Sequence, residues 1–319
     1  MRVLLCEFVT GGGMHGNPLP ASLAREGLLM RDALARDLAE LGDVALTTTA
    51  DPRLPAPPAG RVATLGEADD PWRLWADLAA EADLLIAVAP ETGGLLARLA
   101  ALGHQAGAQV FGPDDETIRI TTSKRETATR LRAAGVATPP AWPADAIPSD
   151  AQGPFVTKPD DGAGCEDTRY WLDRPLPGAV PADHIALPFV EGDAASLFVA
   201  RGGDGGAVIL SANRQLVTVE DGAFRFRGLD VGALDRERPD LVAVAQAVAD
   251  ALPGLDGLFG IDLALGAHGP VVIEVNPRPT TAYAGLRQAL GLNPLRLVAP
   301  FADAAPPARA ATRPVELRL

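Results

Sequence analysis

Short apolar runs alternate with helical patterns along the first third of the chain. Residues 2–9 form an apolar run that ends in glycines, which predicts a buried strand. From Ala21 to Leu41, apolar or small residues recur every three or four positions, which predicts a helix with one buried face. Further strands are predicted at 44–48, 61–65 and 83–90, and a second helix at 71–82. This alternation is typical of a parallel α/β sheet.

The pattern changes after residue 112, where strands separated by turns predominate. Ser123 and Glu126 form a capping box, which predicts a helix that ends near Ala134. A later helix is predicted at 239–252 and a β-hairpin at 257–276. We therefore expect an α/β N-terminal domain with a parallel sheet, followed by an α+β domain with mainly antiparallel strands.

The composition is that of an ordinary globular protein with an excess of acid. The 319 residues are 47% hydrophobic, enough to bury a core, and the net charge of −13 argues against nucleic acid as a partner. Cys6 and Cys165 make neither a disulfide framework nor a metal cluster. Without a signal peptide or an apolar stretch long enough to span a bilayer, we expect a cytoplasmic protein without a membrane partner.

Lysine is almost absent from the chain. Of the 28 basic residues 26 are arginine, and only Lys124 and Lys158 are lysine. A GC-rich genome explains the excess of arginine, but it does not explain why two lysines remain. Lysine is a compact point charge on a flexible stem, so a site that places a cation between phosphates does not always accept arginine.

Three glycines after the first predicted strand, Gly11, Gly13 and Gly16, match the G-x-G-x-x-G pattern of dinucleotide-binding sites. That pattern needs a helix that opens at the glycines, whereas Pro18 and Pro20 delay the helix here. The acidic residue expected after the second strand is also missing, which argues against a Rossmann cofactor. A loop that contacts substrate is the better functional interpretation, and a plain turn is the alternative.

The predicted hairpin carries side chains that its register brings together. If the turn is centred at His268, Asp262 and Glu274 lie opposite each other, and Asn276 shares the face of Glu274. Facing carboxylates on neighbouring strands are destabilising unless a cation lies between them. Oxygen ligands of this kind suit Mg²⁺ with substrate phosphates, and Arg278 would add a cation for phosphoryl oxygens. The alternative is a set of solvated residues on an exposed sheet face.

Both lysines lie where a phosphate could be bound. Lys158 ends the strand PFVTKP and is followed by a loop of small residues that contains Gly162, Ala163 and Gly164. The backbone N–H groups of such a loop and one ammonium can approach a phosphate chain. Lys124 lies in the first turn of its capped helix, where the helix dipole disfavours a cation; a bound anion would resolve that conflict.

The order of these features resembles the ATP-grasp superfamily of carboxylate–amine ligases. The shared features are a lysine in a capped helix, a strand lysine with a glycine loop, an F-V-E-G hinge, an aspartate strand and E-x-N-P-R. The resemblance covers essentially the whole chain. It implies a pre-ATP-grasp substrate domain at 1–112, an ATP-grasp small subdomain with the lysines and the glycine loop at 113–183, and a C-terminal ATP-grasp subdomain with the metal site at 184–319.

The resemblance also implies an ATP site. Lys124 and Lys158 would bind the phosphates, with Lys158 also taking part in catalysis, and Gly162 to Gly164 would be a mobile loop that closes over them. The backbone around Phe189 and Val190 would meet adenine. Two Mg²⁺ ions, for which Mn²⁺ is an alternative, would be held by Asp262, Glu274 and Asn276.

The chain departs from the superfamily pattern in two places. Many relatives carry a ribose-binding glutamate a few residues past the hinge, where this chain has Ala194 and Ala195. Glu191 or Asp193 would then take that role, or it is unfilled. Many relatives also place an arginine two residues before the metal-binding aspartate, where this chain has Gly260. The arginines left to stabilise a tetrahedral intermediate are Arg278 and Arg214.

Three strings narrow the resemblance. EFVTGGG at 7–13, SANRQ at 211–215 and NPRPTTAYAGL at 276–286 are most similar to the tyramine–glutamate ligases of methanofuran biosynthesis, with bacterial relatives expected in methylotrophs. The resemblance implies an ADP-forming ligase of one-carbon metabolism that activates L-glutamate as an acyl phosphate and joins it to tyramine, tyrosine or a related amine. Contacts to these substrates would come from Glu7, Thr10, Gly11, Gly12, Gly13 and Glu91, for each of which a structural role is the alternative.

Two other functions stay open at this point. One is an ATP-grasp ligase for another amino acid or peptide, and the other is a nucleotide-binding regulator without turnover. The oxygen ligands on the hairpin argue against the regulator, whereas Gly260 and the missing ribose acid favour it. The expected partners are small-molecule amino acids and amines, and a homodimer is the assembly to test.

Overall fold

The first sheet of the protein is parallel. The computed structural model describes residues 1–162, 164–176, 178–202, 205–302 and 313–319. The strands of this sheet are β1 Arg2–Glu7, β2 Ala45–Ala50, β3 Arg61–Thr64, β4 Leu84–Val88 and β5 Gln109–Phe111. Their order is β3-β2-β1-β4-β5, and every pair is parallel, which confirms the α/β prediction for the N-terminal region.

Helices cover both faces of the parallel sheet. They are α1 Ala21–Ala39, α2 Pro71–Ala80, α3 Leu95–Ala106 and α4 Asp115–Thr122. Leu5 of β1 belongs to the same buried cluster as Leu34 of α1, whereas Cys6 packs in the cluster that contains Trp75 of α2. Because neighbouring strand residues point to opposite faces and both faces are covered, the strand is apolar throughout. The helical periodicity predicted α1 and α2; α3 and α4 were not specified from the sequence.

A tight turn with π-helical hydrogen bonding, η1 Val9–Gly13, follows β1 directly. The strand therefore ends at Glu7, two residues before the end of its apolar run. Gly12 has a φ of +104°, a conformation that favours glycine. α1 begins only at Ala21, after Pro20, so no α-helix opens at the glycines, which agrees with the argument against a dinucleotide-binding loop.

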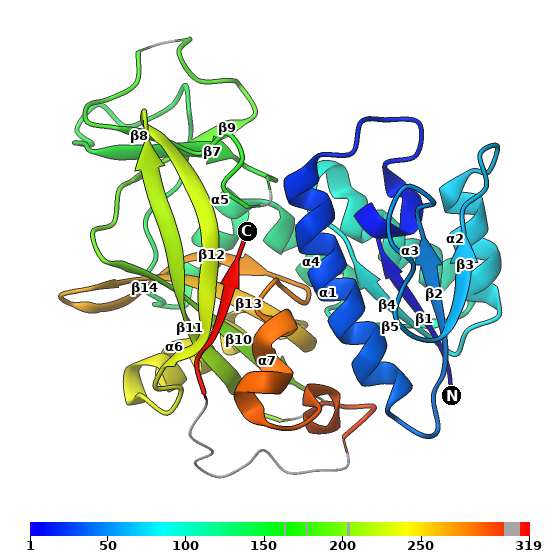
Figure 1. Ribbon diagram of the computed structural model, residues 1–319. Coiled ribbons are helices and arrows are strands. Elements are labelled where there is room, and N and C mark those ends of the chain that lie inside the picture. Colours follow the sequence, from blue (N-terminus) through cyan, green and yellow to red (C-terminus); the bar gives the residue numbers. More distant parts are fainter. Residues whose placement is uncertain (163, 177, 203–204, 303–312) are drawn as a thin grey trace.

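The second sheet is antiparallel. Its strands are β6 Trp142–Pro143, β7 Phe155–Pro159, β8 Arg169–Trp171, β9 His184–Pro188, β10 Asp193–Arg201, β11 Val208–Glu220, β12 Ala223–Leu234, β13 Gly257–Gly266, β14 Gly269–Asn276 and β15 Val315–Arg318. Their order is β14-β13-β10-β11-β12-β8-β7-β9-β6, with β15 paired to β12. Figure 1 shows the long strands β11 and β12 running from the β10, β13 and β14 group up to β7, β8 and β9.

In the described part of the chain, three α-helices and one 3₁₀ helix accompany this second sheet. They are α5 Lys124–Ala133, α6 Pro239–Ala251, α7 Tyr283–Leu290 and η3 Pro294–Leu297. The first two agree with the predicted helices, and the whole region confirms the expected α+β architecture. Strand β15 was not predicted, because its four residues pair only with a strand some 85 positions earlier. None of the helices in the described part of the chain is long and apolar enough to span a membrane.

A shared core and a buried polar cluster join the two sheets. Leu34 of α1 and Leu286 of α7 belong to one hydrophobic cluster, and Figure 1 shows α1 between the parallel sheet and the C-terminal half. The hydroxyl of Tyr283 donates to Asp37 Oδ2 at 2.8 Å, and Arg287 Nη1 donates to Asp37 Oδ1 at 2.7 Å. Burial raises the pKa of Asp37, and these two donors oppose that rise. The interface thus depends on a carboxylate whose partners come from the other half of the chain.

Replacing Tyr283 with phenylalanine tests this interface. Tyr283→Phe keeps the buried ring but leaves Asp37 with one donor fewer, so we expect the free energy of unfolding to fall by about 1–3 kcal/mol. Tyr170→Phe is the matched control, because the Tyr170 hydroxyl has no hydrogen-bond partner among the described residues and its ring keeps its edge contact with Phe189. Urea unfolding measures both variants; equal stability losses in the two would contradict the prediction.

Candidate active site

The predicted carboxylate pair forms on the hairpin of β13 and β14. Asp262 is paired in register with Glu274, as expected. The turn itself differs, because Gly266 pairs with Gly269, which centres the turn before His268 rather than on it. A β-bulge directly after Asp262 places one extra residue in β14 and thereby restores the predicted pairing.

Asp262 is a partly buried carboxylate held by two amides. Gln215 Nε2 of β11 donates to Oδ1 at 2.9 Å, and Asn276 Nδ2 donates to Oδ2 at 3.1 Å. Burial and the neighbouring charge of Glu274 raise the pKa of Asp262 to about 6, against the opposing effect of the amides and of Lys158. The predicted face that unites Asp262, Glu274 and Asn276 is therefore present, and it lines a cavity rather than an open sheet surface.

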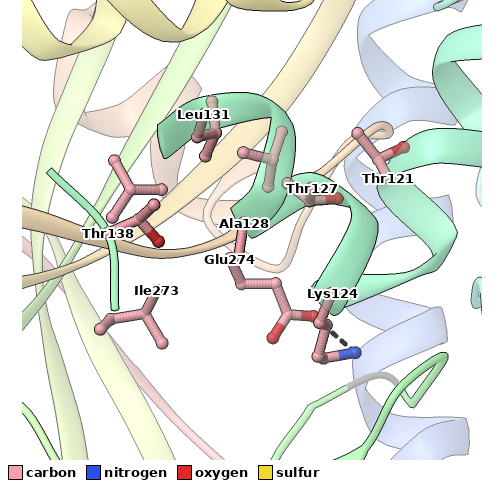
Figure 2. A pocket seen from close by; sticks show the side chains of 10 residues that line it. Thr121, Lys124, Thr127, Ala128, Leu131, Thr138, Ile273 and Glu274 are labelled. Carbon is pink, nitrogen blue, oxygen red and sulfur yellow. Dashed lines mark ion pairs between the residues drawn. The ribbon is translucent and has the colours of Figure 1, made fainter. Parts of the chain in front are cut away.

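Both lysines of the chain pair with Glu274. Lys124 Nζ lies 3.3 Å from Glu274 Oε1, and Lys158 Nζ lies 3.0 Å from Oε2. Figure 2 shows Lys124 reaching from α5 to Glu274, beside a void of about 10 Å³ that is just large enough for one water molecule. Burial raises the pKa of Glu274, but the two ammonium groups outweigh this and hold the pKa below its usual value. Glu274 is thus ionised between two cations.

The start of α5 is docked onto the end of β7 by Asp160. Ser123 Oγ and the backbone N–H of Arg125 donate to the Asp160 carboxylate at 2.7 and 2.9 Å. Lys124 Nζ donates to the carbonyl oxygens of Asp160, at 3.4 Å, and Gly162. In this structure Asp160 and Glu274 supply negative charge beside Lys124 at the start of the helix, and binding of a phosphate there stays a prediction.

The glycine loop lies between the two halves of the protein. The backbone N–H of Gly93, in the turn η2 Thr92–Gly94 after β4, donates to Asp161 Oδ2 at 2.9 Å. Gly164 has a φ of +68°, in the left-handed region, and lines the cavity described next. Ala163, which the sequence places in the same loop, lies outside the described residues.

A cavity of about 560 Å³ lies beside the carboxylates and is apolar at one end and charged at the other. The apolar lining includes the hinge residues Phe189 and Val190 and residues of β11 and β12 such as Val217 and Phe224. The ring of Tyr170 meets that of Phe189 edge-on, with centroids 5.2 Å apart. The charged end contains the predicted residues Lys158, Asp262, Glu274, Asn276 and Arg278. A flat apolar group and a polyanion would fit such a cavity.

Two further predicted residues meet across the interface between the halves. Arg278 Nη2 lies 3.0 Å from Glu91 Oε2, although the two are 187 positions apart, and both side chains are buried. Burial lowers the pKa of Arg278, but Glu91 outweighs it and the net pKa is raised. Arg278 Nε and Glu91 Oε1 are buried and have no hydrogen-bond partner in the described structure; Arg278 lines the cavity, whereas Glu91 is not among its lining residues there. Arg214 also lines the cavity, from an exposed position on β11.

The predicted substrate residues after β1 lie apart from the cavity. Glu7 is buried, and its carboxylate accepts hydrogen bonds from the N–H and the hydroxyl of Thr10 at 2.7 and 2.6 Å. Burial raises the pKa of Glu7, against these donors. Trp75 Nε1 donates to the carbonyl of Gly11, and Gly12 and Gly13 pack against Leu65 and Phe8. Within the described structure none of Glu7, Thr10, Gly11, Gly12 or Gly13 lines the cavity.

The structure gives reasons for the two departures from the superfamily pattern. A Cβ added at Gly260 would lie 2.6 Å from Thr280 Cγ2, so Thr280 fills the space that a larger side chain would need. Ala195 is buried and Ala194 lines the cavity. Asp193 lines the cavity as well, whereas Glu191 is exposed and is not among its lining residues in the described structure.

Two of the polar residues that line the cavity and were not predicted from the sequence make contacts that matter here. Gln215 holds Asp262, and Glu26 of α1 approaches from the N-terminal half, where Thr281 Oγ1 donates to Glu26 Oε2 at 3.0 Å. Gln215 belongs to the string SANRQ. The sequence pattern there did not show which of these side chains face the cavity. The signal at Glu26 was a carboxylate beside the apolar stripe of a helix, three residues after Leu23 and four before Met30.

The donor set of the hairpin suits a hard divalent cation. Asp262, Glu274 and Asn276 present carboxylate and amide oxygens, which Mg²⁺ prefers. Among the described residues no group of three or more histidine, cysteine, aspartate or glutamate side chains forms a metal cluster. An ion here would therefore complete its coordination with phosphate and water rather than with protein alone.

Replacing Asp262 with asparagine tests the charge on this face. The pKa of Asp262 is higher in the folded protein than in the unfolded chain, so its ionisation at neutral pH costs stability, and that cost disappears below about pH 4. In metal-free buffer we expect Asp262→Asn to raise the free energy of unfolding at neutral pH by about 1–2 kcal/mol and to change it little at pH 4. Asp193→Asn, at an exposed carboxylate of the same cavity, is the control. A stability loss in Asp262→Asn at neutral pH would contradict the prediction.

Comparison with known proteins identifies the family. A family model of the ATP-grasp domain matches residues 121–282, just over half of the chain, and a model of the pre ATP-grasp 3 domain matches residues 44–118. Comparison with curated proteins gives no match.

Among solved structures, the chain is similar to an ATP-grasp superfamily protein from Archaeoglobus fulgidus, with a TM-score of 0.74, 24% identity, and coverage of 92% of this chain and 85% of that one. It is also similar to the L-amino acid ligase from Bacillus licheniformis (TM-score 0.66, 18% identity, coverage 92% and 71%). A third similar structure is the D-alanine–D-alanine ligase from Bacillus anthracis (TM-score 0.59, 13% identity, coverage of 88% of this chain and 88% of that one). At these identities the likeness concerns the fold. The match over residues 121–282 shows that the chain belongs to the ATP-grasp family.

Proposed function

We propose that the protein is an ATP-dependent, ADP-forming carboxylate–amine ligase. The observation that carries this proposal is the buried group in which Lys124 and Lys158 flank Glu274 opposite Asp262, next to a cavity with an apolar end. Two ammonium groups and two carboxylates at one point are what a nucleotide polyphosphate with its divalent cation requires. The family to which the chain belongs is named for ATP binding, which supports the same conclusion.

In the proposed complex, adenine lies against Phe189 and Val190 and the phosphates extend toward Lys158. Lys124 reaches Glu274 from behind the cavity, so it would exchange part of its contact with Glu274 for a phosphate oxygen. Asp193 is the nearest candidate for the ribose, since it lines the cavity just past the hinge.

The glycine loop and the oxygen ligands of the hairpin complete the proposed nucleotide site. Gly162 to Gly164, with Asp161 already bonded to Gly93, would cover the phosphates at the boundary between the halves. Asp262, Glu274 and Asn276 would hold Mg²⁺ or Mn²⁺, two ions in the fullest version of the proposal. Such an ion would neutralise phosphate charge and orient the phosphoryl group for transfer.

The proposed reaction has two steps. A substrate carboxylate attacks the γ-phosphorus of ATP, the bond to the β-γ bridging oxygen breaks, and ADP leaves; an amine then attacks the acyl carbon, inorganic phosphate leaves, and the amine gives up a proton. The chain contributes position and charge, as phosphoryl transfer usually requires. Lys158 and Arg278, which both line the charged end, would stabilise the transferred phosphate and the tetrahedral intermediate, with Arg214 as the further candidate.

For substrates we propose L-glutamate and tyramine, tyrosine or a related amine, in a pathway of the methanofuran type. Two of the three strings that suggested these substrates reach the site, because Gln215 of the second and Asn276 of the third both bond Asp262, whereas the first string, at 7–13, lies apart from the cavity. The division at residues 112 and 183, a cytoplasmic location, and a homodimer belong to the same proposal. A ligase for another amino acid or a peptide is the second candidate, and its support is the fold shared with an L-amino acid ligase.

An assay of coupled turnover tests the proposed function. Protein, Mg·ATP, L-glutamate and a panel of amines that includes tyramine and tyrosine should release ADP and phosphate in equal amounts, and only when both substrates are present. Amide product would be identified by mass spectrometry. Release of AMP would contradict the acyl-phosphate route, and ATP binding without ADP from any donor and amine would favour the regulator instead.

Exchange of the two lysines for arginine tests their role as point charges. Lys124→Arg and Lys158→Arg keep the charge, but a bulkier planar group must fit beside Glu274, so we expect each to lower kcat/KM for ATP by about tenfold or more. Arg125→Lys is the matched control, since Arg125 is exposed and adjacent to Lys124. Wild-type kinetics in both lysine variants would remove the lysines from the proposed site.

A further inference from the structure

One carboxylate of the cavity, Glu26, is used by neither the proposed nucleotide site nor the proposed metal site. The acidic residues that line the cavity are Glu26, Asp193, Asp262 and Glu274. Asp262 and Glu274 belong to the hairpin, and Asp193 lies at the hinge end. Glu26 comes from α1, in the N-terminal half, and is therefore the acidic group that this half presents to the cavity.

Glu26 has a fixed position but an incomplete set of partners. Thr281 Oγ1 donates to Oε2 at 3.0 Å, and in the described structure Oε1 accepts no hydrogen bond. Arg278 lies close enough to influence Glu26 electrostatically, but its own ion pair is with Glu91. No ion pair to Glu26 forms within the described part of the chain. A largely buried carboxylate without a cation is costly, so the site favours a positively charged ligand.

Burial acts on Glu26 in the direction expected of such a site. It raises the pKa of Glu26, while the Thr281 hydroxyl and Arg278 oppose the rise and Glu166 adds to it. A bound cation would offset this desolvation. Thr281 donates to one carboxylate oxygen and leaves the other without a donor, and a primary ammonium group, a compact cation with three N–H donors, suits that remaining oxygen.

We propose that Glu26 binds the ammonium group of a substrate of the ligase reaction, with Thr281 holding the carboxylate in place. The inference rests on the proposed function. Two sources share this chemistry, the amine acceptor and the α-ammonium of an amino-acid donor, and both reach the cavity in the proposed reaction. Because α1 belongs to the N-terminal half, this half then takes part directly in substrate selection.

Direct binding tests the inference without requiring turnover. Isothermal titration calorimetry, in Mg²⁺ and a non-hydrolysable ATP analogue, measures the Kd of tyramine, of L-glutamate and of 4-ethylphenol, which has the ring of tyramine without the amine. Glu26→Gln keeps the size of the side chain and an acceptor for Thr281. We expect this variant to raise the Kd of tyramine or of L-glutamate by about 10- to 100-fold. The Kd values of 4-ethylphenol and of the ATP analogue should stay unchanged. A lower affinity for tyramine would show that the ammonium group comes from the amine acceptor. A lower affinity for L-glutamate would show that it comes from the amino-acid donor.

Two further variants make the result specific. Glu26→Asp retains the charge and should recover part of the lost affinity. Glu166→Gln removes a charge that acts on Glu26 through space, but Glu166 is exposed and outside the cavity lining, so affinity should stay within about twofold. Thermal melts check that each variant is folded.

The inference is overturned if Glu26→Gln binds tyramine and glutamate as the wild type does, if the wild type binds neither, or if Glu166→Gln has the same effect as Glu26→Gln. The proposed function fails by a different result, the absence of ADP release in the wild type. A wild type that binds tyramine through Glu26 but does not turn over would therefore contradict the ligase and leave the ammonium site standing.

Discussion

The contact of one buried carboxylate with two ammonium groups organises the centre of this protein. Glu274 belongs to β14, Lys158 to β7 and Lys124 to α5, so the three ionic groups connect three elements that are far apart in the chain. Removal of Glu274 would leave two largely buried ammonium groups without their shared carboxylate, which costs more than a surface ion pair contributes. The position of α5 and of the β7 end relative to the hairpin therefore depends on this contact.

The same arrangement explains why the site is poised for a polyanion. Lys124 and Lys158 each touch Glu274, while Asp262 on the facing strand relies on amides from Gln215 and Asn276. Glu274 therefore pairs with two ammonium groups, whereas Asp262 has an ion pair with neither lysine in the described structure. A phosphate chain that arrives with a divalent ion can redistribute these charges, because the lysines gain phosphate contacts as the carboxylates gain the ion. A pair of exposed carboxylates would have no comparable need for a ligand.

The site is also a product of the interface between the two halves. Glu91 meets Arg278, Gly93 meets Asp161, and Glu26 meets Thr281, each pair uniting an N-terminal residue with a C-terminal one. The shared hydrophobic core and the buried cluster around Asp37 keep α1 against α7 and so fix these contacts. Substrate recognition in such a cavity is inseparable from the packing of the N-terminal sheet.

The sequence by itself determined most of the elements, though not α3, α4 or β15, and much of the charged end of the cavity. Period-two and helical patterns are local, so they predicted the parallel sheet, the capped helix after Ser123 and the pairing of Asp262 with Glu274. Even there, the turn lies before the position expected from the sequence, and Asp262 meets Glu274 only because a β-bulge shifts the register by one residue. Alternating residues give no clear signature of a bulge.

Only the tertiary structure decided which polar residues face the cavity. Glu7 follows a sheet strand as Glu91 does, yet its carboxylate bonds Thr10 nearby while Glu91 reaches Arg278 across 187 positions. Glu26 meets Thr281 across 255 positions, and both lysines pair with Glu274, a contact that the sequence did not predict. The physical reason is that periodicity specifies the buried face of each element, whereas contacts between elements depend on how the faces pack.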